Sequence, residues 1–472
     1  MLPLLDPTPA VLPAWGGLLA VLTTLGLALV ALRALQVRRG LEPEVARKGI
    51  HITMTVVALV LPWLFDSDGP VLLLAGLAVA AMLAVRLVPA LRASIGGVLH
   101  TVGRQSLGDV AFPIAVCVLY LLASESPVLY AIPLLLLGLA DSAAALIGTS
   151  HGLARYATVE GQKSREGSVV FAAVAFLSVH VPLLLFTPTG RLESLLVALI
   201  VATLATIVEA VSWRGLDNLF VPLGTYAVLL RLLTFPTPIL AGHVIVLVGL
   251  VAVAALLRRE TTVGGAGVFG VALVAYLAWA LGGTAWLLPP ALLFLLYTRI
   301  WPAAKEADGL PHDPSRRPHT SHNVFSVASV GMLWLVVSRS VGAELLFPYA
   351  LAWGAYLAFL GVDRMLEARP RWTPGALAWR AAWRSTIVAV GPVLLVEGLR
   401  VLAQTPLAPE QPLVLAGVYL AVGLVVTWTA AYVLSRYKQA IDRDSTEFEG
   451  RVYRAAVVAP LSALGLLALW VR

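Results

Sequence analysis

Residues 138–171 carry an unusual set of polar side chains between two apolar runs. Asp141 stands alone inside the first run, Gly148 and Gly152 follow it, and Lys163 belongs to a short polar segment. A carboxylate inside hydrocarbon costs roughly 2.5–3.5 kcal/mol on insertion scales, so it usually marks a function. Glycines let a backbone approach a ligand closely, and basic side chains bind phosphate. The combination predicts a metal–phosphate site at a membrane face.

The polar segment reads as a hairpin that leads into the next apolar helix. Its candidates for nucleotide and phosphate binding are Lys163, Ser164, Arg165, Glu166, Gly167 and Ser168. Structural alternatives remain open for its neighbours. Gly148 and Gly152 have the i, i+4 spacing of a close helix–helix contact, and Glu166 and Ser168 suit the start of a helix. Neither alternative explains the carboxylate of Asp141.

Two further polar clusters stand at the entries of other apolar runs. Arg47, Lys48 and His51 open the second run, where they suit either phosphate binding or anchoring by positive charge. Ser106 and Asp109 open the fourth run, where helix capping competes with a catalytic role.

The last cluster supplies two more carboxylates. Glu209 stands near the end of the seventh run, and Asp217 and Asn218 follow a short turn. Mg²⁺ takes one or two carboxylates together with substrate phosphates. We therefore predict Asp141, Glu209 and Asp217 as Mg²⁺ ligands. A turn followed by a helix cap is the alternative for Asp217 and Asn218.

Composition excludes an ordinary soluble domain. Of 472 residues, 59% are hydrophobic and only 12% are charged, whereas soluble domains carry about 25% charged residues. We predict an all-α polytopic transmembrane bundle of about 16 spans. The single cysteine excludes an internal disulfide and a thiolate metal site. The expected spans are 11–35, 50–65, 70–90, 110–124, 127–148, 168–186, 192–211, 219–235, 238–257, 264–282, 284–300, 323–338, 345–362, 385–403, 412–435 and 455–471.

The net charge of +7 suits basic cytoplasmic loops and anionic lipids, and we expect no nucleic-acid partner. Basic loops alternate with acidic or neutral ones along the chain, so both termini are expected outside. The first apolar run has no cleavage site after it and is expected to stay in the membrane. All polar clusters of the first half then share the cytoplasmic face, where nucleotides are found.

Weaker candidates have simpler interpretations. His180 and His243 stand alone in apolar runs and suit packing, and Glu397 is a buried acid with Arg400 on the next turn as a partner. A Pro-rich loop is predicted to be a solvated linker and not a metal site. Its polar residues are His312, Asp313, His319 and His322.

Taken in order, these clusters resemble the phytol kinase and dolichol kinase family, which is related to the CTP-using phosphatidate cytidylyltransferases. The resemblance spans residues 47–230, and Ala140 departs from the glycine that the family usually has before the aspartate. It rests on Arg47-Lys48 with His51, Ser106-Leu107-Gly108-Asp109 with Phe112-Pro113, Asp141-x-x-Ala144-x-x-x-Gly148-x-x-x-Gly152, Lys163-Ser164-x-Glu166-Gly167-Ser168, and Glu209 with Asp217-Asn218 before Pro222.

The resemblance implies a multi-pass enzyme of the cell membrane whose site faces the cytoplasm. It would move a phosphoryl group from a nucleoside triphosphate, with CTP expected, to an isoprenoid alcohol such as phytol or dolichol. Asp141, Lys163 and Asp217 are the predicted catalytic residues, with Mg²⁺ on the two aspartates and Lys163 and Arg165 neutralising charge. A cytidylyltransferase making a CDP-lipid and a lipid transporter or flippase are the alternatives. Polar clusters in only one half argue against a transporter.

The predicted domains are residues 1–235, the kinase-like domain, and residues 236–472. In the second domain, residues 261–297 and 322–331 resemble the membrane family that includes phytyl-phosphate kinase. The acidic and glycine motifs expected after residue 363 are missing. We favour a degenerate or structural half, and a second active site making a diphosphate is the alternative.

Overall fold

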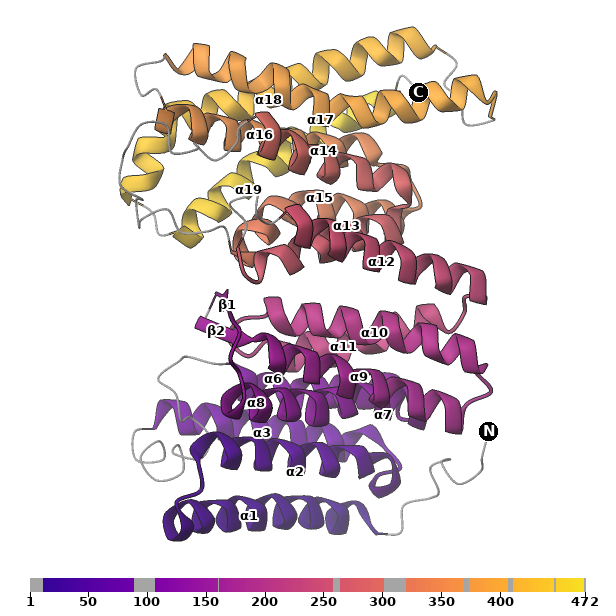
Figure 1. Ribbon diagram of the computed structural model, residues 1–472, viewed down its shortest axis with the longest axis vertical. Coiled ribbons are helices and arrows are strands. Elements are labelled where there is room, and N and C mark those ends of the chain that lie inside the picture. Colours follow the sequence, from indigo (N-terminus) through magenta and orange to yellow (C-terminus); the bar gives the residue numbers. More distant parts are fainter. Residues whose placement is uncertain are drawn as a thin grey trace. The chain divides into compact units, whose positions relative to one another are not determined.

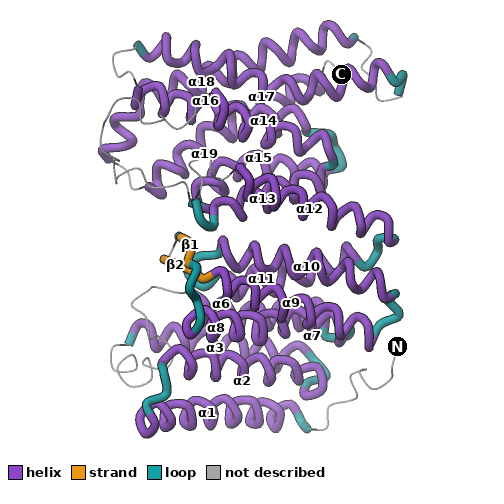
Figure 2. The backbone as a smooth tube through the Cα atoms, viewed as in Figure 1, coloured by secondary structure: helices purple, strands orange, loops and turns teal. Residues whose placement is uncertain are grey.

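The computed structural model is almost entirely helical (Figure 1). It is 86% helical, and its strands within the described residues form one two-stranded hairpin (Figure 2). The prediction of an all-α bundle is therefore confirmed. The structure describes residues 12–88, 107–159, 161–257, 264–300, 320–368, 373–405, 411–444 and 447–470.

Each predicted span falls on a helix. Within the described residues, 12 helices are long and apolar enough to cross a membrane, and three shorter apolar helices accompany them. Hydropathy therefore located these helices correctly.

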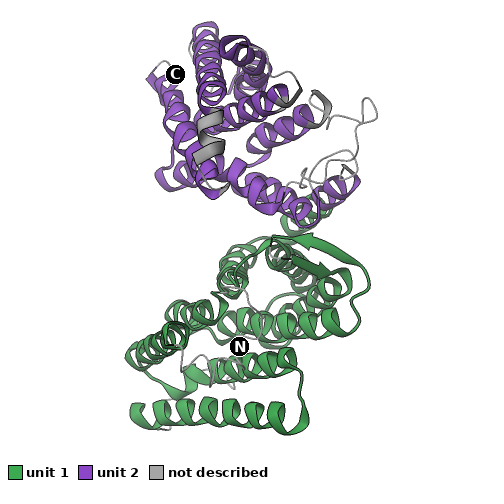
Figure 3. Ribbon diagram, turned by 90° about the vertical axis from the view of Figure 1, so that its left-hand side faces the viewer, with its two compact units in different colours: residues 1–248 green, residues 249–472 purple. Residues whose placement is uncertain are grey.

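The chain divides into two compact units, residues 1–248 and residues 249–472 (Figure 3). The boundary of the units falls inside α12 (Thr237–Leu257), shortly after the predicted domain boundary at residue 235. Each half of the sequence forms a hydrophobic core of its own.

In unit 1, tyrosines tie two helices to a third. The Tyr120 hydroxyl donates to the Phe65 carbonyl at 2.9 Å, and the Tyr130 hydroxyl donates to the Ala58 carbonyl at 2.7 Å. These bonds fix α6 and α7 against α2. The helices of unit 1 are α1 (Ala14–Arg39), α2 (Pro43–Leu64), α3 (Asp68–Leu87), α6 (Gly108–Ala123), α7 (Pro127–Leu135), η2 (Leu136–Ala140), α8 (Asp141–Ser150), α9 (Arg165–Phe186), α10 (Arg191–Val211) and α11 (Asp217–Leu232).

The span that carries Asp141 is not a regular α-helix. α7 contains Pro133 and runs into η2, a π-helical turn, and α8 begins at Asp141. Such turns occur frequently at functional sites. Gly138 in this turn lies against Thr55 of α2, and a Cβ atom at Gly138 would overlap the Thr55 side chain. Only glycine permits this approach, which brings α2 beside Asp141.

An antiparallel hairpin joins α8 to α9, as the polar segment predicts. Its strands are β1 (Arg155–Thr158) and β2 (Gly161–Ser164), and the register pairs Tyr156 with Lys163. Directly paired residues project from the same face of a hairpin. Tyr156 and Lys163 therefore point the same way.

Unit 2 is built around one central helix. α16 packs against α14, α15, α17, α18 and α19, and 89% of its apolar stretch Leu346–Asp363 is buried. Tyr349, Tyr356 and Phe359 of this helix belong to the core of the unit. The helices of unit 2 that follow α12 are α13 (Gly267–Gly282), α14 (Thr284–Ile300), α15 (Ser321–Val341), α16 (Leu346–Ala368), α17 (Pro374–Leu402), α18 (Pro412–Asp444), α19 (Glu447–Ala463) and η3 (Leu464–Trp470).

Candidate functional site

Lys48 and Asp141 form a buried ion pair between α2 and α8. Lys48 Nζ lies 2.5 Å from Asp141 Oδ2, and the two side chains are 4% and 17% exposed. Removing one partner of a buried pair strands the other charge, at a cost of about 3–5 kcal/mol. Asp141, the predicted metal ligand, is therefore held against Lys48, a predicted phosphate-binding residue.

His51, one turn after Lys48, orients the backbone beside Asp141. Its Nε2 donates to the Leu137 carbonyl in the π turn at 2.9 Å and lies 3.5 Å from Asp141 Oδ2. Because a carbonyl only accepts, Nε2 carries a proton. The ring is buried and meets Phe112 edge-on at 5.0 Å between ring centres. These contacts make His51 a positioning residue for Asp141, while its predicted contact with phosphate stays a prediction.

Lys163 and Glu209 form a second pair, between the hairpin and α10. Lys163 Nζ lies 2.6 Å from Glu209 Oε1 and also donates to the Glu209 backbone carbonyl. Burial by itself lowers the pKa of Lys163, but the carboxylates of Glu209 and Asp217 and the hydrogen bond to Glu209 outweigh it, so the pKa lies above its ordinary value. Lys163 is therefore a cation at physiological pH.

The two pairs belong to one electrostatic cluster. Asp141 and Asp217 both interact electrostatically with Glu209 and with Arg47, and Asp217 also interacts with Lys163. Asp141 and Asp217 begin α8 and α11, Lys163 directly precedes α9, Arg47 and Lys48 lie in the second turn of α2, and Glu209 lies near the end of α10. Helix N-termini carry partial positive charge and are ready sites for phosphate. The structure thus brings together residues that sequence analysis had only placed on one membrane face.

Carboxylate geometry limits how a metal ion would bind. In the part of the chain that the structure describes, no three His, Cys, Asp or Glu side chains gather closely enough to hold one ion. Asp141 and Glu209 each pair with a lysine, and no hydrogen bond or ion pair of the Asp217 side chain occurs among the described residues. The donor set suits an ion that arrives with its nucleotide, because Mg²⁺ needs one or two carboxylates besides phosphate oxygens.

Polar residues at the start of α9 also serve that helix. Ser164 Oγ accepts from a backbone N–H in its first turn at 3.0 Å. The Glu166 carboxylate accepts from the Ala154 N–H at 3.1 and 3.3 Å, and Ser168 Oγ donates to the Ser164 carbonyl at 3.2 Å. Ser164 therefore caps α9, whereas Glu166 ties the start of α9 to the backbone at Ala154 and Ser168 bonds back to the preceding turn. Arg165 is exposed, and phosphate binding stays a prediction for all four residues.

Glycines bring α8 and α9 into backbone contact. A Cβ atom at Gly167 would lie 2.9 Å from the Ala144 carbonyl oxygen, and one at Gly148 would lie 2.9 Å from Ser164 Oγ. Gly152 is crowded by the Gly148 carbonyl and the Ser164 side chain. The helix-contact alternative therefore accounts for Gly148, which lies against the start of α9, whereas Gly152 follows the end of α8 and packs against Ser164. Gly167, which that alternative did not include, completes the contact.

Asn218 and Asp109 each stand at the start of one helix and bond it to another helix. Asn218 Nδ2 donates to the Gly108 carbonyl at 2.9 Å, which ties α11 to α6. Asp109, in the first turn of α6, pairs with Arg86 of α3, with Nε to Oδ2 at 3.2 Å. Asn218 and Asp109 therefore hold the frame that presents Asp217, and Ser106 lies outside the described residues.

Sequence analysis missed Tyr156. Its hydroxyl lies 2.8 Å from Ser168 Oγ. Burial raises the pKa of Tyr156, the charge of Glu209 raises it further, and the phenol therefore stays protonated. Strand pairing was the signal that could have found it, because Tyr156 pairs with Lys163 in the hairpin and therefore projects toward the same cluster.

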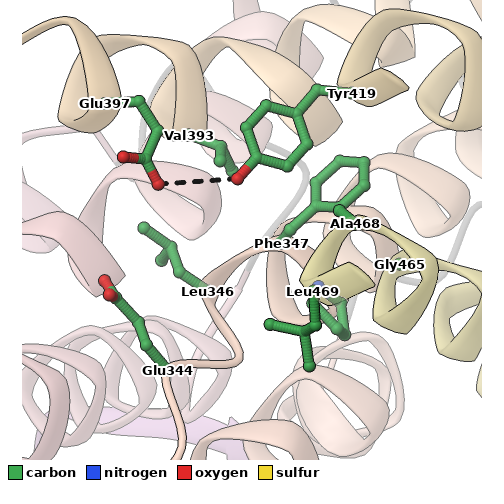
Figure 4. Close-up of a pocket in the computed structure, with 10 residues that line it drawn as sticks. Glu344, Leu346, Phe347, Val393, Glu397, Tyr419, Gly465, Ala468 and Leu469 are labelled. Atoms are coloured by element: carbon green, nitrogen blue, oxygen red, sulfur yellow. Dashed lines mark hydrogen bonds between the residues drawn. The ribbon is translucent and has the colours of Figure 1, made fainter. Parts of the chain in front are cut away.

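A second polar cluster lies in unit 2. Arg400 Nη2 lies 2.5 Å from Glu344 Oε1, and Arg400 Nη1 lies 3.2 Å from Glu397 Oε1, so the predicted Glu397–Arg400 pair is confirmed. The Tyr419 hydroxyl donates to Glu397 at 3.5 Å, beside Phe347 in one small pocket (Figure 4). One arginine thus bridges two carboxylates.

The lone histidines of unit 1 pack, as predicted. His180 shares a 3.0 Å hydrogen bond with Ser194 and stacks on Phe176, and His243 stacks on Phe235. Neither belongs to the cluster around Asp141. Three of the four polar residues of the predicted linker, His312, Asp313 and His319, lie outside the described residues.

Comparison with known proteins places part of the chain among enzymes. It is 35% identical over 222 residues to a phytol kinase of Synechocystis sp., and the match covers 46% of this chain and 91% of that protein. No family model matches the chain, and no solved structure matches it. More than half of this chain therefore lies outside the match.

Proposed function

The chain belongs to the phytol kinase family, and from this premise we propose that it transfers the terminal phosphoryl group of a nucleoside triphosphate to a long-chain isoprenoid alcohol. CTP is the expected donor, and phytol is the first candidate acceptor, with dolichol next. The alcohol's tail would lie among the helices of unit 1, with its hydroxyl at the level of the lipid headgroups.

The cluster of unit 1 is the observation that carries this proposal. It contains two lysine–carboxylate pairs, Lys48–Asp141 and Lys163–Glu209. Asp217 interacts electrostatically with the second pair, and Glu209 and Arg47 each interact with both Asp141 and Asp217. Phosphoryl transfer demands mainly positioning and neutralisation of charge. A frame of paired charges at helix ends supplies both, because each cation is held in place by a carboxylate before the nucleotide arrives.

Mg²⁺ fits the carboxylates that remain available. Asp217 has no side-chain hydrogen bond among the described residues, and Asp141 keeps 17% of its side chain exposed. Both interact electrostatically with Arg47. Asp141 and Asp217 would hold the ion, which when bound neutralises the donor phosphates. Lys163 and Arg47 would add positive charge around the triphosphate.

We further propose that the site faces the cytoplasm at the cell membrane. Arg38 and Arg39 end α1, and Arg47 and Lys48 lie in the second turn of α2 beyond the same junction. Basic residues near the ends of spans favour the cytoplasmic side. Nucleoside triphosphates are available there, which agrees with the proposed donor.

The test uses the purified full-length protein in lipid nanodiscs. Each γ-labelled nucleoside triphosphate would be supplied in turn with Mg²⁺ and phytol, dolichol or a shorter isoprenoid alcohol. The expected product is a labelled lipid monophosphate with release of the nucleoside diphosphate, most efficiently from CTP. Formation of a CDP-lipid with release of pyrophosphate would instead establish a cytidylyltransferase. A protein that transfers no phosphoryl group from any donor would end the kinase proposal.

A further inference from the structure

The first turns of α2 present a stripe of polar side chains on the side that faces Asp141. The stripe consists of Glu44, Arg47, Lys48 and His51. Residues three and four positions apart are neighbours on a helix, and Lys48 and His51 both approach the Asp141 carboxylate. Glu44 therefore lies at the edge of the same cluster, although sequence analysis did not single it out.

Glu44 holds one edge of the Arg47 guanidinium. Arg47 Nε donates to Glu44 Oε2 at 2.9 Å, and Arg47 Nη2 donates to Glu44 Oε1 at 2.6 Å. Two parallel bonds of this kind fix the orientation of the guanidinium plane, which a single bond does not. The guanidinium has further N–H donors on Nη1 and Nη2, and among the described residues the Arg47 side chain makes hydrogen bonds only to Glu44. The remaining donors are therefore available to a ligand.

The Arg47 side chain is open to a ligand that arrives from solvent. It is 38% exposed, whereas the neighbouring Lys48 side chain is 4% exposed. A ligand therefore reaches Arg47 without entering the helix bundle. Arg47 also interacts electrostatically with Asp141 and Asp217, the two carboxylates proposed to hold Mg²⁺. Its charge thus acts where the donor phosphates are proposed to bind.

Packing alone does not account for Glu44. Its carboxylate is repelled by that of Asp141, and a partly exposed ion pair of this spacing contributes little to stability. Arg47 interacts electrostatically with Asp141 and Asp217, yet among the described residues it bonds to neither. Asp217 has no cation of its own in the described part of the chain. Glu44 therefore competes for a guanidinium that would otherwise be drawn to Asp217.

We propose that Glu44 is a positioning residue, which holds Arg47 ready for the phosphates of the nucleotide and keeps it from pairing with Asp217. This inference rests on the proposed function and names a residue that prepares its nucleotide site. Asp217 then stays available, and Arg47 meets the phosphate with its orientation already fixed. Ordering a long side chain during binding costs free energy, so an arginine that is ordered beforehand binds more tightly. Glu44 thus acts on nucleotide affinity and not on the chemical step.

Equilibrium binding to the full-length protein in nanodiscs tests this role. The probe is radiolabelled β,γ-methylene CTP with Mg²⁺, which cannot transfer its terminal phosphoryl group. Glu44→Gln removes the charge that holds Arg47. Glu42→Gln is the matched control, because Glu42 precedes the first turn of the same helix, is exposed and makes no capping hydrogen bond. We expect Kd to rise about five- to tenfold in Glu44→Gln and to stay within about twofold of wild type in Glu42→Gln.

Steady-state kinetics should show the same division. The KM for nucleotide should rise with Kd in Glu44→Gln, with kcat at saturating nucleotide within about threefold of wild type. Glu44→Asp, which keeps the charge, should restore most of the affinity. Glu44→Ala repeats the test if the glutamine variant folds poorly, since alanine favours a helix.

A double-mutant cycle separates positioning of Arg47 from a general effect of charge. If Glu44 acts through Arg47, Glu44→Gln should change Kd by less than about twofold in an Arg47→Ala background. Equal Kd values in Glu44→Gln and wild type, or the full defect in the Arg47→Ala background, would overturn the assignment. A wild type that binds no nucleotide would instead refute the proposed function, so the two failures are distinguishable.

Discussion

Unit 1 and unit 2 each bury a cluster of charged side chains, but the two clusters are built differently. In unit 2, Arg400 bridges Glu344 and Glu397 on neighbouring elements. In unit 1, each carboxylate of a pair has its own lysine, and a further carboxylate, Asp217, interacts electrostatically with Lys163 and Glu209. The first arrangement shares one cation between two acids on packed helices, which suits packing. The second holds each cation by its own carboxylate and adds a carboxylate that has no cation of its own among the described residues, which suits a ligand.

Backbone irregularity follows the same division. The cluster of unit 1 depends on a π turn before Asp141, on Gly138 against Thr55, and on a strand hairpin inserted among helices. The cluster of unit 2 is carried by the ends of regular helices and a short loop at Glu344. Departures from regular geometry persist where function requires them. This contrast favours unit 1 as the catalytic half and unit 2 as a structural half.

The largest expected effect comes from Asp141→Asn. Asparagine preserves the shape and can still accept from Lys48, but it removes the charge that would hold a metal–nucleotide complex. We expect phosphorylation to fall at least about 1,000-fold, equivalent to roughly 4 kcal/mol of transition-state stabilisation, in a protein that still inserts and folds. The rate of labelled lipid phosphate formation measures this directly.

Glu397→Gln in unit 2 is the matched control, since it neutralises a comparably buried and paired acid. Its activity should remain within about threefold of wild type if the two clusters differ as argued. An equal loss of activity in both variants would erase the distinction between the units.

Much of the candidate site was predictable from the sequence. A carboxylate in an apolar run is costly enough to stand out, which identified Asp141 and Glu209, and the i, i+3 spacing gave the Glu397–Arg400 pair. The helices followed from hydropathy, because in a membrane nearly every backbone polar group must be satisfied within its own helix.

The pairing of the charges was not predictable. Lys48 meets Asp141 across 93 positions of the chain, and Lys163 meets Glu209 across 46. Such contacts depend on how helices pack, which local patterns do not encode. The π turn was also not predicted. Lysines that sequence analysis assigned to phosphate turn out to be held by carboxylates.

Lys163→Met should have the next largest effect, on stability. It leaves the Glu209 carboxylate buried without its cation, and breaking one side of such a pair costs about 3–5 kcal/mol. The double variant Lys163→Met, Glu209→Gln should recover most of this loss because no charge is stranded. Thermal unfolding is followed through the reactivity of Cys117, the buried single cysteine of the chain, which lies in unit 1.

The contribution of the Lys163–Glu209 pair to stability should decrease only at strongly alkaline pH. Because folding raises the pKa of Lys163, its contribution to stability is fully present below its unfolded pKa, about 10.4, and is lost as pH rises through the higher folded value. The stability difference between wild type and the double variant should therefore stay constant from about pH 8 to pH 10. A difference that already declines across this range would contradict the pairing of Lys163.

Arg400→Met in unit 2 should destabilise less and leave activity intact. Its partners Glu344 and Glu397 lose their shared cation, but Glu344 has 32% of its side chain exposed and can take up water instead. We expect a loss of about 2 kcal/mol, seen as a lower midpoint of thermal unfolding by circular dichroism. Phosphorylation of the alcohol, measured below that midpoint, should match wild type. A variant as stable as wild type but inactive would move the catalytic role to unit 2.

The smallest expected effect separates two glycines of unit 1 helices. Gly167→Ala adds a methyl group 2.9 Å from the Ala144 carbonyl oxygen, whereas Gly224→Ala in α11 adds one with nothing within 4 Å. Overpacking of this kind costs about 1–3 kcal/mol, and alanine in an open helix position gains up to about 1 kcal/mol over glycine. Gly167→Ala should therefore lower the unfolding midpoint reported by Cys117, and Gly224→Ala should keep or raise it. Because α8 and α9 flank the hairpin that carries Lys163, Gly167→Ala should also reduce kcat. A loss of stability with unchanged kcat would show that this contact serves packing and does not position Lys163.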